Sequence, residues 1–162
     1  MNRRVILILL GGVGFLCLCT VSFGTLFLVF TDSTVPSDVS VLVDAPRAVP
    51  LNEPFAIVVT VRNLTAVSQT LDSIDIQNSY LEGVQISQSD PPFSDDFEIP
   101  LVGYQSYTYF TPIFGNDTLE IELVGEGIAE GEFEGTIDVC INNGADCVSR
   151  TLSIEVGETT GR

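Results

Sequence analysis

An uncharged run near the N-terminus limits what this chain can fold into more than any other feature. From Val5 to Phe30 the sequence reads VILILLGGVGFLCLCTVSFGTLFLVF, which is 26 residues without a charge. As an α-helix, such a run would extend about 39 Å, more than the roughly 30 Å hydrocarbon core of a bilayer. The run therefore predicts one transmembrane helix at residues 5–30, whose excess length a tilt or frayed ends would absorb.

The charges on either side of this run predict its orientation. Arg3 and Arg4 precede it, whereas Asp32 and Asp38 follow it. Because positive residues stay on the cytoplasmic side, we expect the N-terminus in the cytoplasm and the rest of the chain in the periplasm or at the cell surface. The expected organisation is a cytoplasmic tip at 1–4, the helix at 5–30, a linker at 31–37, a domain at 38–157 and a flexible tail at 158–162.

Two alternatives to an uncleaved anchor are open. Cleavage of a signal peptide near Ser22 and Gly24 would leave the hydrophobic stretch Thr25–Phe30 as the new N-terminus. A lipoprotein signal needs a small residue before its cysteine, but Cys17 and Cys19 both follow Leu. Each alternative fits the sequence less well than a permanent single-pass anchor in the cell membrane.

Small residues within the predicted helix indicate a surface for helix packing. Thr20 and Gly24 form a small-xxx-small pair, and Gly11, Gly12 and Gly14 narrow the helix further. Such residues allow a neighbouring helix to approach closely. They are the candidate residues for lateral association in the membrane.

The chain beyond the apolar run is strongly acidic. It contains all 22 acidic residues and four of the six Arg, a formal net charge of −18, and the whole chain has no Lys and no His. This charge repels phosphate backbones and anionic lipid head groups, so nucleic acid is not an expected partner. It favours cations or basic protein surfaces, and it would also keep a sheet protein soluble.

Apolar residues beyond the linker follow a period of two, which is typical of half-buried β-strands. Phe55, Ile57, Val59 and Val61 share one face, and Gly, Pro, Asn and Asp separate the runs. The expected strands are Val39–Val43, Phe55–Arg62, Leu71–Gln77, Leu81–Ser87, Tyr104–Ile113, Thr118–Leu123, Phe133–Ile141 and Val148–Val156. The pattern predicts an all-β domain of two antiparallel sheets packed as a β-sandwich, with a barrel as the alternative.

Three segments resemble parts of a known family. The run 55–63 resembles the second strand of bacterial and archaeal immunoglobulin-like modules of the CARDB type. The segment 101–106 is similar to a glycine-containing turn of those modules, and 131–139 to their penultimate strand. This resemblance, which extends over about 38–156, implies an immunoglobulin-like antiparallel β-sandwich. The chain has no Trp and so lacks the Cys, Trp, Cys core of antibody domains.

Two cysteines flank a hairpin signal. Asn143 and Gly144 favour a two-residue type I′ turn, which would place Cys140 directly opposite Cys147. Facing residues in a hydrogen-bonded pair lie about 5.5 Å apart, within the range that a disulfide spans. We predict a disulfide on the outer face of the sheet, since Val139 and Ile141 should face the core. A redox-active or metal-binding pair is the alternative.

Two N-glycosylation patterns lie on the expected exported side. They are Asn63-Leu64-Thr65 and Asn116-Asp117-Thr118. A host with the required machinery could modify Asn63 and Asn116. Patterns this short also arise by chance.

Two acidic clusters and one aromatic cluster suggest ligand binding. The acidic clusters are Asp90, Asp95, Asp96 and Glu98, and Glu126, Glu130, Glu132 and Glu134. Oxygen-rich loops of this kind can hold calcium, although neither cluster matches a defined calcium loop. The aromatic residues Tyr104, Tyr107, Tyr109 and Phe110 could contact a carbohydrate, or could pack within the sandwich.

The inventory of side chains argues against catalysis. Without His and Lys, the usual bases for a Ser or Cys nucleophile are missing, and no spacing identifies two facing carboxylates for glycoside hydrolysis. We therefore expect no enzyme activity, no catalytic residue, no cofactor and no metal. The leading hypothesis is a membrane-anchored module that acts by protein–protein contact, as an accessory subunit of a membrane complex or as an adhesion unit. A domain that binds calcium or carbohydrate is the alternative.

Overall fold

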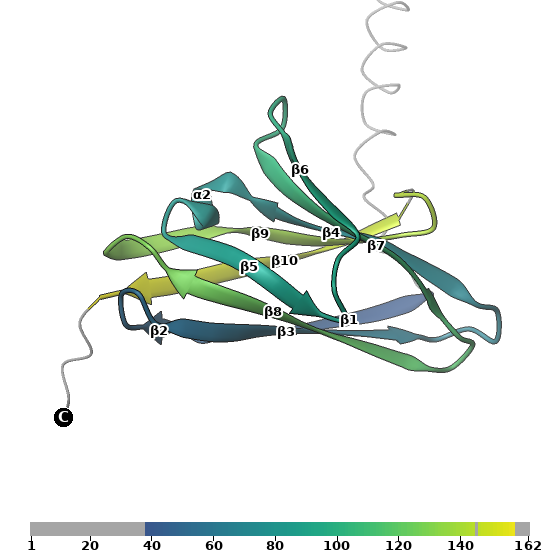
Figure 1. Cartoon of the computed structure of the whole chain (residues 1–162). Helices are drawn as coiled ribbons and strands as arrows, with labels where there is room; N and C mark the ends of the chain where they lie inside the picture. The colour runs from purple at the N-terminus through teal and green to yellow at the C-terminus, as the bar shows by residue number, and fades with distance from the viewer. Residues whose placement is uncertain (1–37, 145, 158–162) are drawn as a thin grey trace, which may run out of the picture. The chain divides into compact units, whose positions relative to one another are not determined.

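A computed structural model describes residues 38–144 and 146–157. This part of the chain forms ten strands and one short helix (Figure 1). The elements are β1 (Val39–Asp44), β2 (Ala48–Val49), β3 (Pro54–Asn63), β4 (Gln69–Gln77), α2 (Asn78–Leu81), β5 (Val84–Asp90), β6 (Asp95–Ile99), β7 (Tyr104–Ile113), β8 (Thr118–Gly127), β9 (Gly131–Ile141) and β10 (Asp146–Val156).

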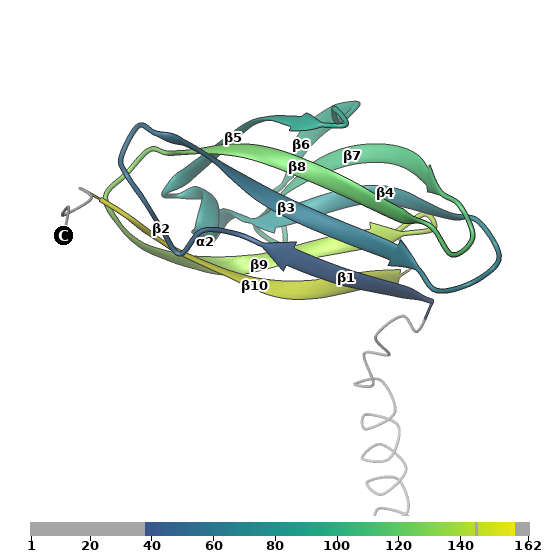
Figure 2. The same ribbon diagram turned by 90° about the horizontal axis from the view of Figure 1, so that it is seen from below.

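The strands form two sheets that pack face to face. One sheet has the order β1-β3-β8-β5 and the other the order β2-β10-β9-β4-β7-β6. Figure 2 shows β1, β3 and β8 lying as one layer beside the layer of β9 and β10. The domain is therefore a β-sandwich, and the barrel alternative is wrong.

The order of the strands is that of an immunoglobulin constant-type domain. In sequence order, β1, β3, β4, β5, β8, β9 and β10 take the positions of strands A to G, with A-B-E-D in one sheet and G-F-C in the other. The hairpin of β6 and β7 is an addition between the fourth and fifth of these strands, and it extends the six-stranded sheet beyond β4. The immunoglobulin-like sandwich expected from the sequence is confirmed.

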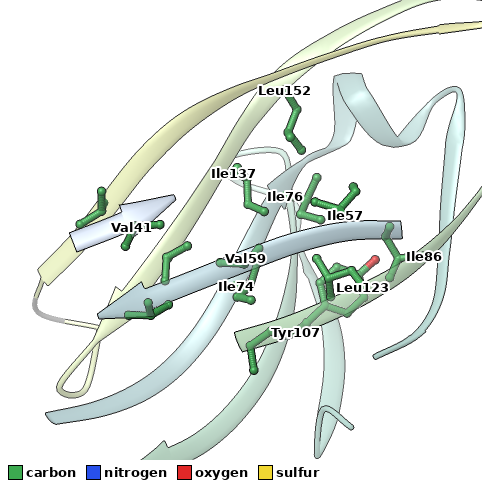
Figure 3. Packing of buried hydrophobic residues seen from close by; sticks show 14 of the residues in the cluster. Val41, Ile57, Val59, Ile74, Ile76, Ile86, Tyr107, Leu123, Ile137 and Leu152 are labelled. Carbon is green, nitrogen blue, oxygen red and sulfur yellow. The ribbon is translucent and has the colours of Figure 1, made fainter. Parts of the chain in front are cut away.

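The alternating residues of the strands form the core. Ile57, Val59 and Val61 on β3 are fully buried, as are Ile121 and Leu123 on β8. Figure 3 shows side chains from both sheets meeting in this core. Because side chains of a strand alternate between its faces, burial of every second residue is what a sheet with one solvated face requires.

The structure differs from the predicted secondary structure at β2, β5, β6 and α2. All eight expected strands are present, but the strand expected at Leu81–Ser87 is β5 at Val84–Asp90, because Leu81 is the last residue of α2. The strands β2 and β6 were not predicted. β2 has two residues and pairs with β10 in parallel, so the sheets are not purely antiparallel. β6 has no buried residue, so its sequence lacks the alternation that identifies the other strands. The helix α2, with four residues, was also not predicted.

Several expectations concern residues outside the described ranges. They are the tip, helix and linker at 1–37, the packing residues Gly11, Gly12, Gly14, Thr20 and Gly24, and the tail at 158–162. Within the ranges that the structure describes, no helix has the length and apolar character needed to cross a membrane.

Candidate interaction surface

The cysteine hairpin has the predicted register and contains the predicted disulfide. Cys140 on β9 lies directly opposite Cys147 on β10, and the two are bonded. Their Cα atoms are 4.1 Å apart, closer than the 5.5 Å expected and nearer to the spacing of a non-hydrogen-bonded pair. The turn also differs from the predicted one, because Asn142 has a positive φ as well as Asn143 and Gly144.

One of the two cysteines of the disulfide is less exposed than expected. Cys140 is on the opposite face of β9 from Val139 and Ile141, as predicted, but it is only 4% exposed. Its sulfur lies 3.6 Å from Oδ2 of Asp75 on the neighbouring strand β4. The bond therefore joins a buried cysteine on β9 to an exposed cysteine on β10, on the outer face of the sheet.

Of the two interpretations of the aromatic residues, packing within the sandwich holds for two of the four. Tyr107 and Tyr109 are buried in the core. Tyr104 is on the other face of β7, where its hydroxyl oxygen lies 2.6 Å from Thr136 Oγ1. Phe110 is 66% exposed at an irregular point of β7, where its φ is 51°. These four side chains therefore offer no shared aromatic surface for a sugar ring.

The acidic clusters are not oxygen-rich loops. Seven of the eight residues are on strands: Asp90 on β5, Asp95, Asp96 and Glu98 on β6, Glu126 on β8, and Glu132 and Glu134 on β9. Glu130 alone is in the turn between β8 and β9. Across residues 38–144 and 146–157, no group of three or more His, Cys, Asp or Glu side chains is placed to hold a metal ion.

The two glycosylation patterns differ in accessibility. Asn63 is fully buried, and its Nδ2 donates hydrogen bonds to the carbonyl oxygens of Val67, Ile113 and Phe114. A glycan attaches to this nitrogen, so the folded domain has no room for one at Asn63. Asn116 is exposed in the turn after β7 and is the accessible site of the two.

A recess that the sequence did not predict opens where edge strand β5 and β7 border the gap between the sheets. Its volume is about 220 Å³. We call it the open flank, and it is lined by Leu81, Val84, Gln85, Ile86, Gln105, Tyr107 and Ile128. Most of these side chains are apolar, and the volume is below the roughly 300–1,000 Å³ of pockets for small ligands. The open flank therefore suits one or two side chains of a partner better than a substrate.

The added hairpin of β6 and β7 gives the open flank an acidic rim. Asp96 and Glu98 lie directly opposite Tyr107 and Gln105, so these four side chains share one face of the hairpin. Gln105 Nε2 donates a 2.9 Å hydrogen bond to Asp96 Oδ2. Burial raises the pKa of Tyr107, and the charge of Asp96 raises it further. The rim is therefore negative, over an apolar floor.

Unpaired strand edges border the open flank. In the described part of the chain, β5 pairs only with β8 and β6 pairs only with β7. Figure 1 shows the hairpin of β6 and β7 standing away from β5. Such edges present free backbone N–H and C=O groups to which an extended segment can pair. Leu101 and Val102, in the turn between β6 and β7, are also exposed.

Comparisons with known proteins report similarity of fold at low identity. The CARDB domain of a Pyrococcus furiosus protein is 14% identical over 74% of this chain and 94% of that chain, with a TM-score of 0.46. AvmM, described as catalysing macrocyclization in alchivemycin A biosynthesis, is 9% identical over 77% of this chain and 92% of its own, with a TM-score of 0.49.

A third similar structure is the α-2-macroglobulin of Escherichia coli. It is 12% identical over 74% of this chain but only 9% of its own length, with a TM-score of 0.47. No protein-family model and no curated protein matches the sequence. Similarities this low carry no information about activity or partner.

Proposed function

We propose that this chain is a non-catalytic, single-pass membrane-anchored module that acts by protein–protein contact, as an accessory subunit of a membrane complex or as a surface adhesion unit. The observation that supports contact most directly is the open flank, an apolar recess with an acidic rim between two unpaired strand edges. The uncharged run at 5–30 and the Arg residues before it support the anchor and the export of the domain.

The chemistry of the open flank indicates the kind of partner. Val84 and Ile86 on its floor favour an apolar side chain, and Asp96 and Glu98 on its rim favour a Lys or Arg beside it. The net charge of −16 of the whole chain repels acidic partners. The proposed occupant is therefore an extended segment of a partner protein that combines apolar and basic residues.

A second surface pocket is the feature that best supports the alternative function of calcium binding. It has a volume of about 500 Å³, and Glu130, Glu132 and Glu155 line it. Glu132 and Glu155 lie directly opposite each other on β9 and β10. Carboxylates can bind Ca²⁺, but the described residues contain no arrangement of three such groups around one point. Addition of calcium is expected to leave the melting temperature of the protein unchanged.

Copurification with a charge-reversal pair tests the proposal. The full chain, isolated from native membranes in mild detergent, should retain a stoichiometric protein partner. Asp96→Lys, on the recess side of β6, is expected to weaken this association about tenfold or more, since loss of a desolvated charge pair costs several kcal/mol. Asp95→Lys changes the same charge on the other face of β6 and should leave the association intact.

Several results would contradict the proposed function. Equal loss with Asp95→Lys and Asp96→Lys would show that net charge, rather than the open flank, governs association. A monomer that binds calcium or sugar and retains no protein would support the alternative function. Extraction of the full chain by alkaline carbonate would contradict the anchor independently of the partner.

A further inference from the structure

Three exposed apolar side chains gather at one end of the sandwich. Leu64 and Val67 are in the loop between β3 and β4, and Phe114 is in the loop between β7 and β8, with exposed fractions of 50%, 71% and 65%. We call Leu64, Val67 and Phe114 the tip patch. Exposed apolar side chains that are grouped together, rather than scattered singly, mark a surface that contacts a protein or a membrane.

The side chain of Asn63 locks the two loops that carry the tip patch. Its Nδ2 lies 2.7 Å from the carbonyl oxygen of Val67 and 3.2 Å from that of Phe114. Its Oδ1 accepts hydrogen bonds from the backbone N–H and the hydroxyl of Thr65, each at 2.9 Å. One buried amide thus fixes both loops.

Backbone contacts between the two loops also hold them together. Asn116 N–H donates a 2.8 Å hydrogen bond to the carbonyl oxygen of Thr65. Gly115 lies against the backbone of Ala66 so closely that a Cβ on it would come within 2.3 Å of the Ala66 carbonyl oxygen. The tip patch is therefore held in a fixed shape, and its exposure is not the result of frayed loops.

The chain enters the domain beside the tip patch. Leu64 N–H donates a 2.8 Å hydrogen bond to the carbonyl oxygen of Asp38, the residue before β1. Seven residues, 31–37, separate Asp38 from Phe30, the last residue of the uncharged run. Even a fully extended linker of that length spans at most about 25 Å. In an anchored protein, a linker of this length limits how far this end of the domain can lie from the bilayer and allows the tip patch to reach it.

We propose that the tip patch inserts into the interfacial region of the bilayer that holds the anchor. This inference rests on the proposed anchoring and adds a second point of attachment to it. Apolar side chains of interfacial elements are buried about 5–10 Å into the boundary between head groups and acyl chains. Asp38 and Asp117 flank the patch and the chain has no Lys, so the fitting surface is a zwitterionic bilayer.

Insertion of the tip patch would also fix the orientation of the domain relative to the membrane. The open flank lies toward the opposite end of the sandwich, because Val84 pairs with Gly127 and Ile128 follows it in the turn before β9. With the tip patch in the interface, the open flank would face away from the lipid. The two surfaces can then be occupied at once.

Tryptophan fluorescence tests the insertion directly, since the chain has no Trp of its own. The full-length Phe114→Trp variant is reconstituted in phosphatidylcholine vesicles whose acyl chains are brominated near the head groups. Its fluorescence is expected to fall by about half or more relative to unbrominated lipid, as for a side chain at interfacial depth. Leu101→Trp, at the 95% exposed turn before β7, is the control and should show no quenching.

Other outcomes separate the tip patch from the anchor. A protein that stays in the vesicles after carbonate treatment but whose position 114 is not quenched overturns the insertion and leaves the anchor standing. Shielding from acrylamide without quenching by brominated lipid also overturns it, because protein would then cover the patch. Release by carbonate overturns both. If Phe114→Trp does not fold, Val67→Trp replaces it with the same expectations.

Discussion

Asp75 on β4 lies directly opposite Asp138 on β9, so two carboxylates face each other on the outer face of the six-stranded sheet. Asp75 Oδ1 accepts a 2.6 Å hydrogen bond from Ser106 Oγ. The buried Oδ1 of Asp138 has no hydrogen-bond partner within the described ranges. Like charges on facing residues destabilise a sheet, and an unpartnered buried oxygen costs further free energy. This position is therefore not optimised for stability.

Replacement of Asp138 by Asn should stabilise the domain. Asp138→Asn removes the repulsion and supplies an amide that can donate to Asp75, so the free energy of unfolding should rise by about 1 kcal/mol. Urea denaturation of the full chain in detergent measures this change. Glu53→Gln removes one charge at an exposed loop position and should change stability by less than about 0.5 kcal/mol. A less stable Asp138→Asn variant would show that the carboxylate makes a needed contact.

Two tyrosines should respond in opposite ways to loss of the hydroxyl. Tyr80 is fully buried and its hydroxyl has no hydrogen-bond partner among the residues described. Tyr80→Phe should therefore leave the free energy of unfolding unchanged or raise it by about 1 kcal/mol. Tyr104→Phe loses the hydrogen bond to Thr136 and should lower it by about 1 kcal/mol. Equal destabilisation by both variants would contradict this assignment.

Removal of the disulfide should have a modest effect. The disulfide closes only a short loop, since Cys140 and Cys147 are seven residues apart. The double variant Cys140→Ser with Cys147→Ser should lose about 2.5 kcal/mol of unfolding free energy by the loop-entropy relation. Peptide mapping without reductant should find the linked pair in the parent protein. Two free thiols at these positions would contradict the structure.

A single amide-to-acid change should weaken the tip loops. Asn63→Asp keeps the acceptor but replaces the donor that serves three carbonyl oxygens, so those oxygens would face a carboxylate. We expect a loss of about 3 kcal/mol in urea denaturation. Asn116→Asp is the same change at an exposed position and should cost less than about 0.5 kcal/mol. Comparable losses in both variants would argue against a special role of Asn63.

Stability should fall in alkaline solution. Burial raises the pKa of Tyr80, Tyr107 and Tyr109 above the value of 10.0 for a free tyrosine. Above pH 10 the unfolded chain therefore releases protons that the folded domain retains, so unfolding becomes more favourable by up to about 1.4 kcal/mol per pH unit for each tyrosine. Denaturation midpoints at pH 9, 10 and 11 measure the slope. If tyrosinate absorbance rose before the domain unfolds, the raised pKa of these buried tyrosines would be contradicted.

The sequence was informative where structure depends on local pattern. The strands with a buried face were predicted because every second residue is apolar, as in Ile57, Val59 and Val61. The pairing of Cys140 with Cys147 was predicted because the register of a hairpin follows from its turn. Even there, the turn differs, since Asn142 also adopts a positive φ.

The remaining features depend on contacts between distant parts of the chain. β6 has no buried residue and most of its residues are acidic, so it exists as a strand because β7 pairs with it, and no local pattern reveals that. The open flank follows from the same hairpin. Asn63 fits a glycosylation pattern by sequence, yet the carbonyl oxygen of Ile113 that its side chain binds is 50 residues away.

The two ends of the domain lie at opposite ends of its strands. Val39 at the start of β1 pairs with Asn63 beside the tip loops, whereas Val156 at the end of β10 pairs with Gly131 near the far turn. Tension applied between these points would run along the strands, across the direction of their hydrogen bonds. The bonds between β1 and β3 would then be loaded in shear, all together, and would not open one after another. Separation of the two ends by a pulling force would therefore require several of these bonds to break at once.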